Sequence, residues 1–280
     1  MFIASSTAVF GGLEAALKTL LPAGITAFEA YELHVPGHPE LKHVGVANRS
    51  DEELSALRER LAVSGARLCA LAGHTDLLAA DTDERARGTA HLERCLEAAR
   101  LLACPIVVTA SGHLRGDPGG ALSTLVGALR HLGDKATDAG AKVAVEGHYG
   151  EFIQSTEDLI RLMEAVDHPA VGVNYDPFHF VFLHENMAQW APRAAPWVVH
   201  THIHDVARGW SPERPWYDQE DVPGRGVIDY AAMLSALCSV GYGGALSIEL
   251  HKVFHGLTED HVLARDFLQK QIAQLGIAEG

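Results

Sequence analysis

Short apolar runs alternate with longer segments of helical periodicity along almost the whole chain. The apolar runs, some with β-branched residues at every second position, predict eight strands. These lie at residues 2–6, 25–31, 67–72, 105–110, 142–145, from 171 to the acid at 176, 197–203 and 245–248. Between them, apolar residues recur at helical spacing, for example at Leu92, Leu96, Ala99 and Leu102. The pattern therefore predicts a strand followed by a helix, eight times over.

Polar residues mark the expected beginnings of four of these helices. Ser50 followed by Glu53 has the spacing of a capping box, in which each side chain bonds the other residue's backbone N–H. Ser155, Asp229 and Thr258 precede later helical segments, and we expect them to act as N-caps.

Regular alternation with short connections predicts parallel strands joined by right-handed crossovers. Eight units in 280 residues favour an α/β fold with a single domain over residues 1–280, the parallel eight-stranded (β/α)8 or TIM barrel. A doubly wound open sheet is the alternative. Such a sheet often has a glycine-rich phosphate loop after its first strand, and residues 5–11 do not form one.

Acids and histidines gather at the predicted C-terminal ends of the strands, where TIM barrels carry their active sites. The clearest case follows residue 171, because Pro177 cannot continue a central strand and so leaves Asp176 and His179 at its tip. The residues in comparable positions are His74, His113, Glu146, Asp176, His179, His202 and Glu249. Asp-Pro is also ordinary turn chemistry, so this segment alone decides nothing.

Strand ends converge on the axis of a closed barrel, so three carboxylates and an imidazole would meet there. Without a cation those carboxylates would repel one another. Ion pairs with Arg or Lys are the alternative, but the last four strands place no basic residue beside these acids. An oxygen-rich set with one histidine suits Mn²⁺ best, and Mg²⁺, Co²⁺ or Zn²⁺ also fit. We therefore predict a divalent metal ion as cofactor.

Composition narrows the class of protein. Lys and Arg number 22 against 36 Asp and Glu, a formal net charge of −14, which argues against nucleic-acid and anionic-membrane partners. No run approaches 18 apolar residues, so we expect no membrane-spanning helix. No basic region precedes the apolar stretch at the N-terminus, so we do not expect this stretch to be a secretory signal. Four cysteines without a Cys-x-x-Cys pair indicate buried thiols in a reducing, cytoplasmic setting.

Several motifs carry a family resemblance over nearly the whole chain. Val-Glu-Gly-His at 145–148, Asn-Tyr-Asp-Pro-Phe-His at 174–179, His-Thr-His-Ile-His-Asp at 200–205, Leu-Ser-Ile-Glu at 246–249 and the turn at 222–229 resemble the sugar phosphate isomerase/epimerase family of xylose isomerase-like TIM barrels. The resemblance implies Glu146, Asp176, His202 and Glu249 as metal ligands. It makes His179 a residue that binds substrate or supports a ligand. It also selects His202 over His200, which lies deeper and is expected to be a core residue.

The remaining candidates surround the predicted metal. His74 and His113 are expected to contact substrate hydroxyls, unless they are further metal ligands or fill the upper barrel. The long loop at 206–226 carries Arg208, Trp210 and Trp216. The resemblance to ketose epimerases implies that Arg208 binds an oxygen atom of the substrate. The tryptophan rings are suited to pack on the apolar faces of sugars. Burial of the loop or a contact in a homo-oligomer is the alternative role of these aromatics.

The function predicted from these features is that of a metal-dependent isomerase or epimerase of a small carbohydrate-like compound. Glu146 and Glu249 would serve as base and acid around a metal-stabilised enediolate. Loss of a β-hydroxyl or β-alkoxyl from the same enediolate would instead give a lyase acting on an oxidised sugar or inosose. An apurinic endonuclease is disfavoured by the charge and by the lack of the Asp-x-His pair that supplies that enzyme's third metal.

Overall fold

The computed structural model of the chain describes residues 1–276. Eight parallel strands close into a barrel in the order β1-β10-β7-β6-β5-β4-β3-β2. They are β1 (Phe2–Ser6), β2 (Ala27–Tyr31), β3 (Arg67–Ala72), β4 (Ile106–Ala110), β5 (Lys142–Glu146), β6 (Val171–Tyr175), β7 (Val198–Ile203) and β10 (Ala245–Ile248). The prediction of an eight-stranded parallel (β/α)8 barrel is confirmed, and the open-sheet alternative is excluded because β1 pairs with both β2 and β10.

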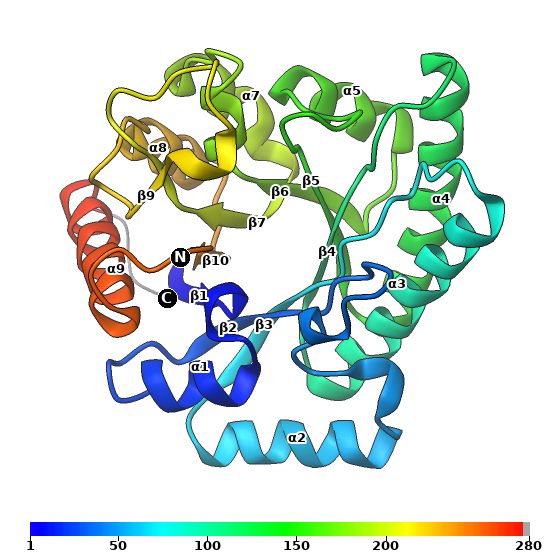
Figure 1. Cartoon of the computed structure of the whole chain (residues 1–280), viewed down its shortest axis with the longest axis horizontal. Helices are drawn as coiled ribbons and strands as arrows, with labels where there is room; N and C mark the ends of the chain where they lie inside the picture. The colour runs from blue at the N-terminus through cyan, green and yellow to red at the C-terminus, as the bar shows by residue number, and fades with distance from the viewer. Residues whose placement is uncertain (277–280) are drawn as a thin grey trace.

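Helices surround the strands on the outside of the barrel (Figure 1). They are α1 (Leu13–Leu20), α2 (Asp51–Val63), α3 (Thr82–Leu102), α4 (Pro118–Ala139), α5 (Thr156–Val166), α6 (Pro177–Val181), α7 (Met187–Ala194), α8 (Tyr230–Ser239) and α9 (Leu257–Gln274). Their apolar faces pack against the outer faces of the strands in one large core that includes Leu54, Leu96, Leu129 and Leu234. Burial of these faces, rather than helix propensity alone, stabilises the outer layer.

The predicted N-caps are confirmed at three helices and wrong at the fourth. Ser50 and Ser155 both form capping boxes, and Asp229 accepts the backbone N–H of Ala232. Helix α9 instead begins after Gly256, without a side-chain cap, so Thr258 lies inside the first turn. Asp260 explains the difference, because its carboxylate accepts the N–H groups of the residues just before the helix.

The barrel interior changes from small and apolar to polar along its axis. Near the N-terminal ends of the strands, Ala4, Ala27, Cys69 and Ala245 from four strands pack together. Further along, the inward positions of β2, β7 and β10 carry buried polar side chains, namely Glu29, His200, His202 and Ser247. Small side chains fill the narrow lower barrel, and the chemistry is concentrated towards the C-terminal ends of the strands.

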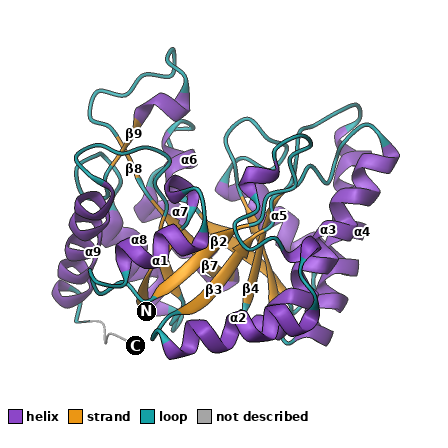
Figure 2. Cartoon of the chain, turned by 60° about the horizontal axis from the view of Figure 1, so that its bottom comes forward, coloured by secondary structure: helices purple, strands orange, loops and turns teal. Residues whose placement is uncertain are grey.

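The loop after β7 contains structure that sequence patterns did not predict. Residues Asp205–Val206 (β8) and Glu220–Asp221 (β9) pair as a two-stranded antiparallel sheet. Figure 2 shows this hairpin above the barrel, at the end of the strands where the long loops gather. The carboxylate of Asp205 fastens it, accepting the N–H groups of Val206, Gly224, Gly226 and Ile228. A side chain at 226 would collide with that carboxylate, since a Cβ there would lie 2.2 Å from its oxygen.

Within residues 1–276, none of the helices combines the length and apolar character needed to span a lipid bilayer.

Candidate metal centre

Four side chains from four neighbouring strand ends converge at the C-terminal mouth of the barrel. They are Glu146, Asp176, His202 and Glu249, and each offers one ligand atom within 4.8 Å of the others. From the Nδ1 atom of His202, the nearest oxygens of Glu249, Glu146 and Asp176 lie at 2.9, 3.1 and 3.9 Å. All four are buried. The structure thus brings together the complete set predicted as metal ligands.

Local structure explains how each candidate ligand is positioned. Glu146 is the last residue of β5. His202 faces inward from β7, directly opposite Ser247 of β10 in the strand register. Asp176 follows β6 and caps the short helix α6 by accepting the N–H of Phe178 at 2.9 Å. Pro177 at the first position of that helix lacks the N–H that a further ladder bond would need. The strand therefore stops where its carboxylate meets the other ligands.

The orientation of His202 is fixed from the side opposite the cluster. Its Nε2 atom lies 2.8 Å from Glu29 Oε1 and donates a hydrogen to that buried carboxylate. Glu29 also accepts from His200 Nε2 at 2.9 Å and from Ser247 Oγ at 2.7 Å. Because Nε2 donates to Glu29, Nδ1 is the His202 atom that faces the three carboxylates, and it would offer its lone pair to a cation bound there in place of its proton. His200 is the satisfied core residue that sequence analysis expected.

The electrostatics of the cluster are dominated by three buried carboxylates that lie close together and by the histidines around them. Burial acts to raise the pKa of Glu146, but His202 and His74 hold it well below its usual value. Burial acts to lower the pKa of His202, but Glu249, Glu29 and Glu146 raise it well above its usual value. For Asp176 burial prevails over His204 and the pKa of its carboxyl is raised. Within residues 1–276, every ion pair of the three acids is to a histidine.

These residues fit a divalent cation. Three carboxylates and one imidazole nitrogen form an oxygen-rich donor set, which suits Mn²⁺, Mg²⁺ or Co²⁺ and is compatible with Zn²⁺. A cation at this position would replace the protonated imidazole as the charge that holds the acids together. The supporting bond from Glu29 to the far nitrogen of His202 is the arrangement usual for a metal-binding histidine.

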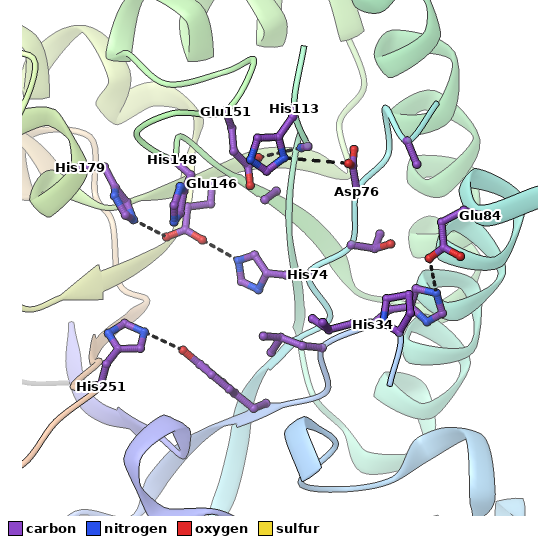
Figure 3. A pocket seen from close by; sticks show the side chains of 18 of the residues that line it. His34, His74, Asp76, Glu84, His113, Glu146, His148, Glu151, His179 and His251 are labelled. Carbon is purple, nitrogen blue, oxygen red and sulfur yellow. Dashed lines mark hydrogen bonds and ion pairs between the residues drawn. The ribbon is translucent and has the colours of Figure 1, made fainter. Parts of the chain in front are cut away.

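A cavity of about 580 Å³ opens beside the cluster and is large enough for a small organic substrate. Figure 3 shows His74, His148 and His179 around Glu146, with His34 and Glu84 at the far side. His74 Nε2 lies 2.5 Å from Glu146 Oε2. His179 Nε2 lies 3.6 Å from Asp176 and 3.8 Å from Glu146, and its ring packs on His148 at 3.9 Å.

The other predicted substrate-binding residues divide into two groups. His113 and Trp216 line the cavity, with His113 largely exposed at its mouth and Trp216 edge-on to His148 and His179. Arg208 and Trp210 do not line it. Arg208 is exposed and donates to the carbonyl of Arg225, because the turn after β8 carries it outward.

Trp210 is held away from the cavity by its own packing. Its ring contacts Phe182 at 5.5 Å and His184 at 5.2 Å, between the hairpin and the segment after α6. In this conformation Trp210 buries the loop, which is the structural role that sequence analysis left open for it.

Sequence analysis gave no role to several residues that support the site. Tyr31 donates to Glu249 Oε1 at 2.6 Å and lies 3.1 Å from His251 Nε2. Glu220 of β9 lies 3.0 Å from both His204 and His251, and His204 in turn contacts Asp176. For Glu29 and Tyr31 a signal existed, since both occupy alternate positions at the end of one predicted strand. Glu220 sits in a loop without periodicity, and its sequence gave no such signal.

Comparison with known proteins agrees with this architecture. The family of xylose isomerase-like TIM barrels matches residues 22–270. An inosose dehydratase from Geobacillus thermodenitrificans (strain NG80-2) is 33% identical over 135 residues, which are 45% of this chain and 45% of that protein. The match thus spans about half the length of this curated relative.

Two solved structures extend the likeness to the whole fold. An L-ribulose 3-epimerase superposes with a TM-score of 0.78 at 18% identity, covering 99% of this chain and 96% of its own. The IOLI protein, in a crystal structure with a bound zinc atom, superposes with a TM-score of 0.77 at 20% identity, and the match covers 98% of each chain. At these identities the structural likeness shows a common fold. The match over residues 22–270 shows that this chain belongs to the family of xylose isomerase-like TIM barrels.

Proposed function

We propose that the protein is a divalent-metal-dependent isomerase or epimerase of a small sugar or related polyhydroxy carbonyl compound. The observation that carries the proposal is the position of two carboxylates, Glu146 and Glu249, which belong to the four-ligand set and also line the cavity. Mn²⁺ is the proposed metal, with Mg²⁺, Co²⁺ and Zn²⁺ as alternatives. When bound, the cation supplies Lewis acidity that polarises a carbonyl and acidifies the neighbouring C–H bond.

Glu146 and Glu249 are arranged alike around the centre. One oxygen of each faces His202, at 3.1 and 2.9 Å. The other oxygen of Glu146 lies 2.5 Å from His74, and the other oxygen of Glu249 accepts from Tyr31 at 2.6 Å. Each carboxylate can therefore face the metal with one oxygen and exchange a proton on the cavity side with the other. His74 and Tyr31 are placed to pass that proton on.

The proposed chemistry is proton removal next to a carbonyl by one of these acids, and proton return by the other. Return on the other carbon isomerises the substrate, and return on the opposite face epimerises it. Neutral His179 and the ring of Trp216 would orient hydroxyls and an apolar face of the sugar. Burial acts to lower the pKa of His179 and keeps it well below its usual value, so this imidazole can both donate and accept a hydrogen bond.

A lyase is the second candidate, and the match to an inosose dehydratase favours it. The same proton abstraction would be followed by loss of a β-hydroxyl or β-alkoxyl group in place of reprotonation. An apurinic endonuclease remains a weaker alternative, because the net charge of −14 provides little attraction for a phosphate backbone.

Isotope exchange tests the common first step. The metal-loaded protein is incubated with candidate ketoses and oxidised cyclitols in deuterated water, and the α-carbon of recovered material is examined by NMR. We expect deuterium at that carbon, and loss of about 10²–10⁴-fold in rate for Glu146→Gln or Glu249→Gln. Glu32→Gln is the control, since Glu32 is buried at the end of the same sheet but bonds only loop N–H groups. Turnover of an active substrate without cleavage of any α C–H bond would refute the proposal.

A further inference from the structure

We propose that the substrate of this cavity carries no phosphate or carboxylate group and is an uncharged polyhydroxy carbonyl compound. The inference rests on the proposed function and goes further, because it decides between two classes of substrate on which the proposed chemistry would work equally well. Three features of the structure carry it: the charges that line the cavity, and the occupants of two loops where barrels of this kind often bind phosphate.

The cavity wall is acidic. Five carboxylates line it, those of Asp76, Glu84, Glu146, Glu151 and Glu249. Within residues 1–276, Arg115 is the one Arg or Lys side chain that lines it, and its Nη1 atom lies 2.6 Å from Asp76 Oδ2. That guanidinium is therefore neutralised before any ligand enters. A bound divalent cation would offset two of the three carboxylates around it, and Arg87 pairs with Glu84 from outside the lining. The negative charge left over is that of the third carboxylate and of Glu151.

The histidines of the cavity do not reverse this balance. All of them except His148 already lie within 4.0 Å of a protein carboxylate, and Nδ1 of His148 lies 3.0 Å from the carbonyl oxygen of Tyr149. His34 lies 3.2 Å from Glu84, and His113 lies 4.0 Å from Asp76. His251 lies 3.0 Å from Glu220. An entering phosphate would have to compete with each of these acids for its imidazole.

The loop after the seventh barrel strand is a common phosphate site in TIM barrels, where backbone N–H groups receive the anion. Here four N–H groups of that loop are already bonded to the protein's own Asp205. Its carboxylate accepts those of Val206, Gly224, Gly226 and Ile228 at 2.9 to 3.1 Å, and its side chain is buried. The turn at 222–229 has the glycine-rich character of an anion-binding loop, but the anion is part of the chain.

The loop after the eighth barrel strand is closed in the same way. Asp260 accepts the N–H groups of Phe254 and His255 at 2.8 and 3.2 Å, and Glu220 accepts that of His251 at 3.2 Å. Both loops that would normally contribute donors to a phosphate thus have those donors bonded to buried acids. A second negative charge brought close to them would meet repulsion from those acids.

The experiment compares matched probes on the metal-loaded full chain. Dissociation constants are measured by calorimetry for D-fructose and D-fructose 6-phosphate, and for myo-inositol and myo-inositol 1-phosphate. We expect the neutral member of at least one pair to bind, with its phosphate binding at least about tenfold more weakly. Tighter binding of a phosphate than of its neutral partner, or no binding of any probe, would overturn the inference.

A gain-of-function variant sharpens the test. Asp76→Asn keeps an acceptor for the N–H of Leu78 but removes the charge that neutralises Arg115, so the ratio of phosphate to neutral affinity should rise about threefold or more. Glu157→Gln on the outer face of α5 makes the same change in net charge and should leave the ratio unaltered. No rise in Asp76→Asn would also count against the inference.

The two proposals fail separately. If fructose phosphates bind tightly and exchange their α-hydrogen, the substrate class is wrong and the enediolate chemistry stands. If neutral sugars bind but no substrate exchanges its α-hydrogen with solvent, the enediolate chemistry is wrong and the substrate class stands.

Discussion

The two nitrogens of one histidine side chain have separate tasks in this site. His202 directs Nδ1 at three carboxylates and gives Nε2–H to Glu29. Glu29 in turn collects three donors, from His202, His200 and Ser247, which lie on two different strands. Burial acts to raise the pKa of Glu29, but His202 and His200 hold it well below its usual value, so it is an ionised acceptor. We therefore regard Glu29 as a positioning residue for the metal centre.

Glu29→Gln tests this role. A glutamine has one acceptor oxygen and an NH2 group, so it cannot accept from both imidazoles in the present geometry. His202 would then move its hydrogen to Nδ1, where it blocks the lone pair that faces the carboxylates. We expect metal affinity to fall about 10–100-fold, as for other residues that support a metal ligand. Affinity is measured by titration with Mn²⁺, beside His202→Ala, for which stoichiometric binding should be lost.

Glu32→Gln is the matched control for that measurement. Glu32 is also fully buried near the end of β2, but its carboxylate accepts the N–H groups of Val44, Gly45 and Val46 in a loop. Its variant should lose stability and keep its metal affinity within about twofold. Equal affinities for Glu29→Gln and the wild type would remove Glu29 from the description of the site.

At the scale of elements, the hairpin of β8 and β9 links the loop after β7 to the candidate metal centre. A chain of contacts runs from Asp176 through His204 to Glu220, and from Glu220 to His251, each step at about 3.0 Å. Burial acts to raise the pKa of Glu220, but hydrogen bonds from His204 and His251 lower it to about 2. The hairpin is thus held by a buried charge network as well as by its two-stranded pairing.

Glu220→Gln should therefore lower stability in a pH-dependent way. The lowered pKa of Glu220 gives stability that is fully present above the ordinary value of 4.5 and is lost as pH falls towards 2. For His204 and His251 burial acts in the opposite direction, but the neighbouring acids raise their pKa values. Their contribution is present below the ordinary value of 6.5 and is lost as pH rises through the raised values.

The decrease in the free energy of unfolding of Glu220→Gln should then be largest between pH 4.5 and 6.5, and it should amount to about 3 kcal/mol or less. Urea unfolding of metal-free protein at several pH values measures it, so that pH-dependent loss of metal does not contribute. A constant difference from pH 3 to 9 would show that the network does not act through charge.

At the scale of the whole molecule, barrel closure itself creates the demand for a cation. Glu146, Asp176 and Glu249 come from separate strands, and the fold brings their carboxylates together in a buried place. In the unfolded chain these acids are far apart and hydrated. Folding therefore works against their mutual repulsion unless a positive charge binds between them.

Removing the metal should accordingly lower the melting temperature. A ligand that binds the native state alone at 100 times its dissociation constant adds about 2.7 kcal/mol of stability. For a domain of this size that corresponds to about 5 °C. Calorimetric scans of chelator-treated and Mn²⁺-loaded protein give the shift, and His202→Ala should show little of it. Identical melting temperatures, in a protein shown by titration to bind the metal, would contradict the expectation.

The sequence by itself predicted the repeating unit and the four candidate ligands that the structure brings together. Period-two and period-3.6 patterns reveal a buried strand and a half-buried helix because they arise from local geometry. Proline at 177 shows where a strand must stop, and so places Asp176 at a tip. Once eight such units were counted, the convergence of the strand-end acids and histidines followed from the geometry of a closed barrel. The family resemblance then selected Glu146, Asp176, His202 and Glu249 among them.

Tertiary structure decided which side chains support those four residues and what surrounds them. Glu29 and His202 are far apart in sequence, and only the crossing of the barrel interior brings them into contact. The path of the loop after β7 turned Arg208 outward and Glu220 inward, since side-chain packing and the acceptor Asp205 fix a loop that has no periodicity to read. Local pattern thus specifies elements and their ends, whereas the partners of buried charges depend on contacts between distant segments.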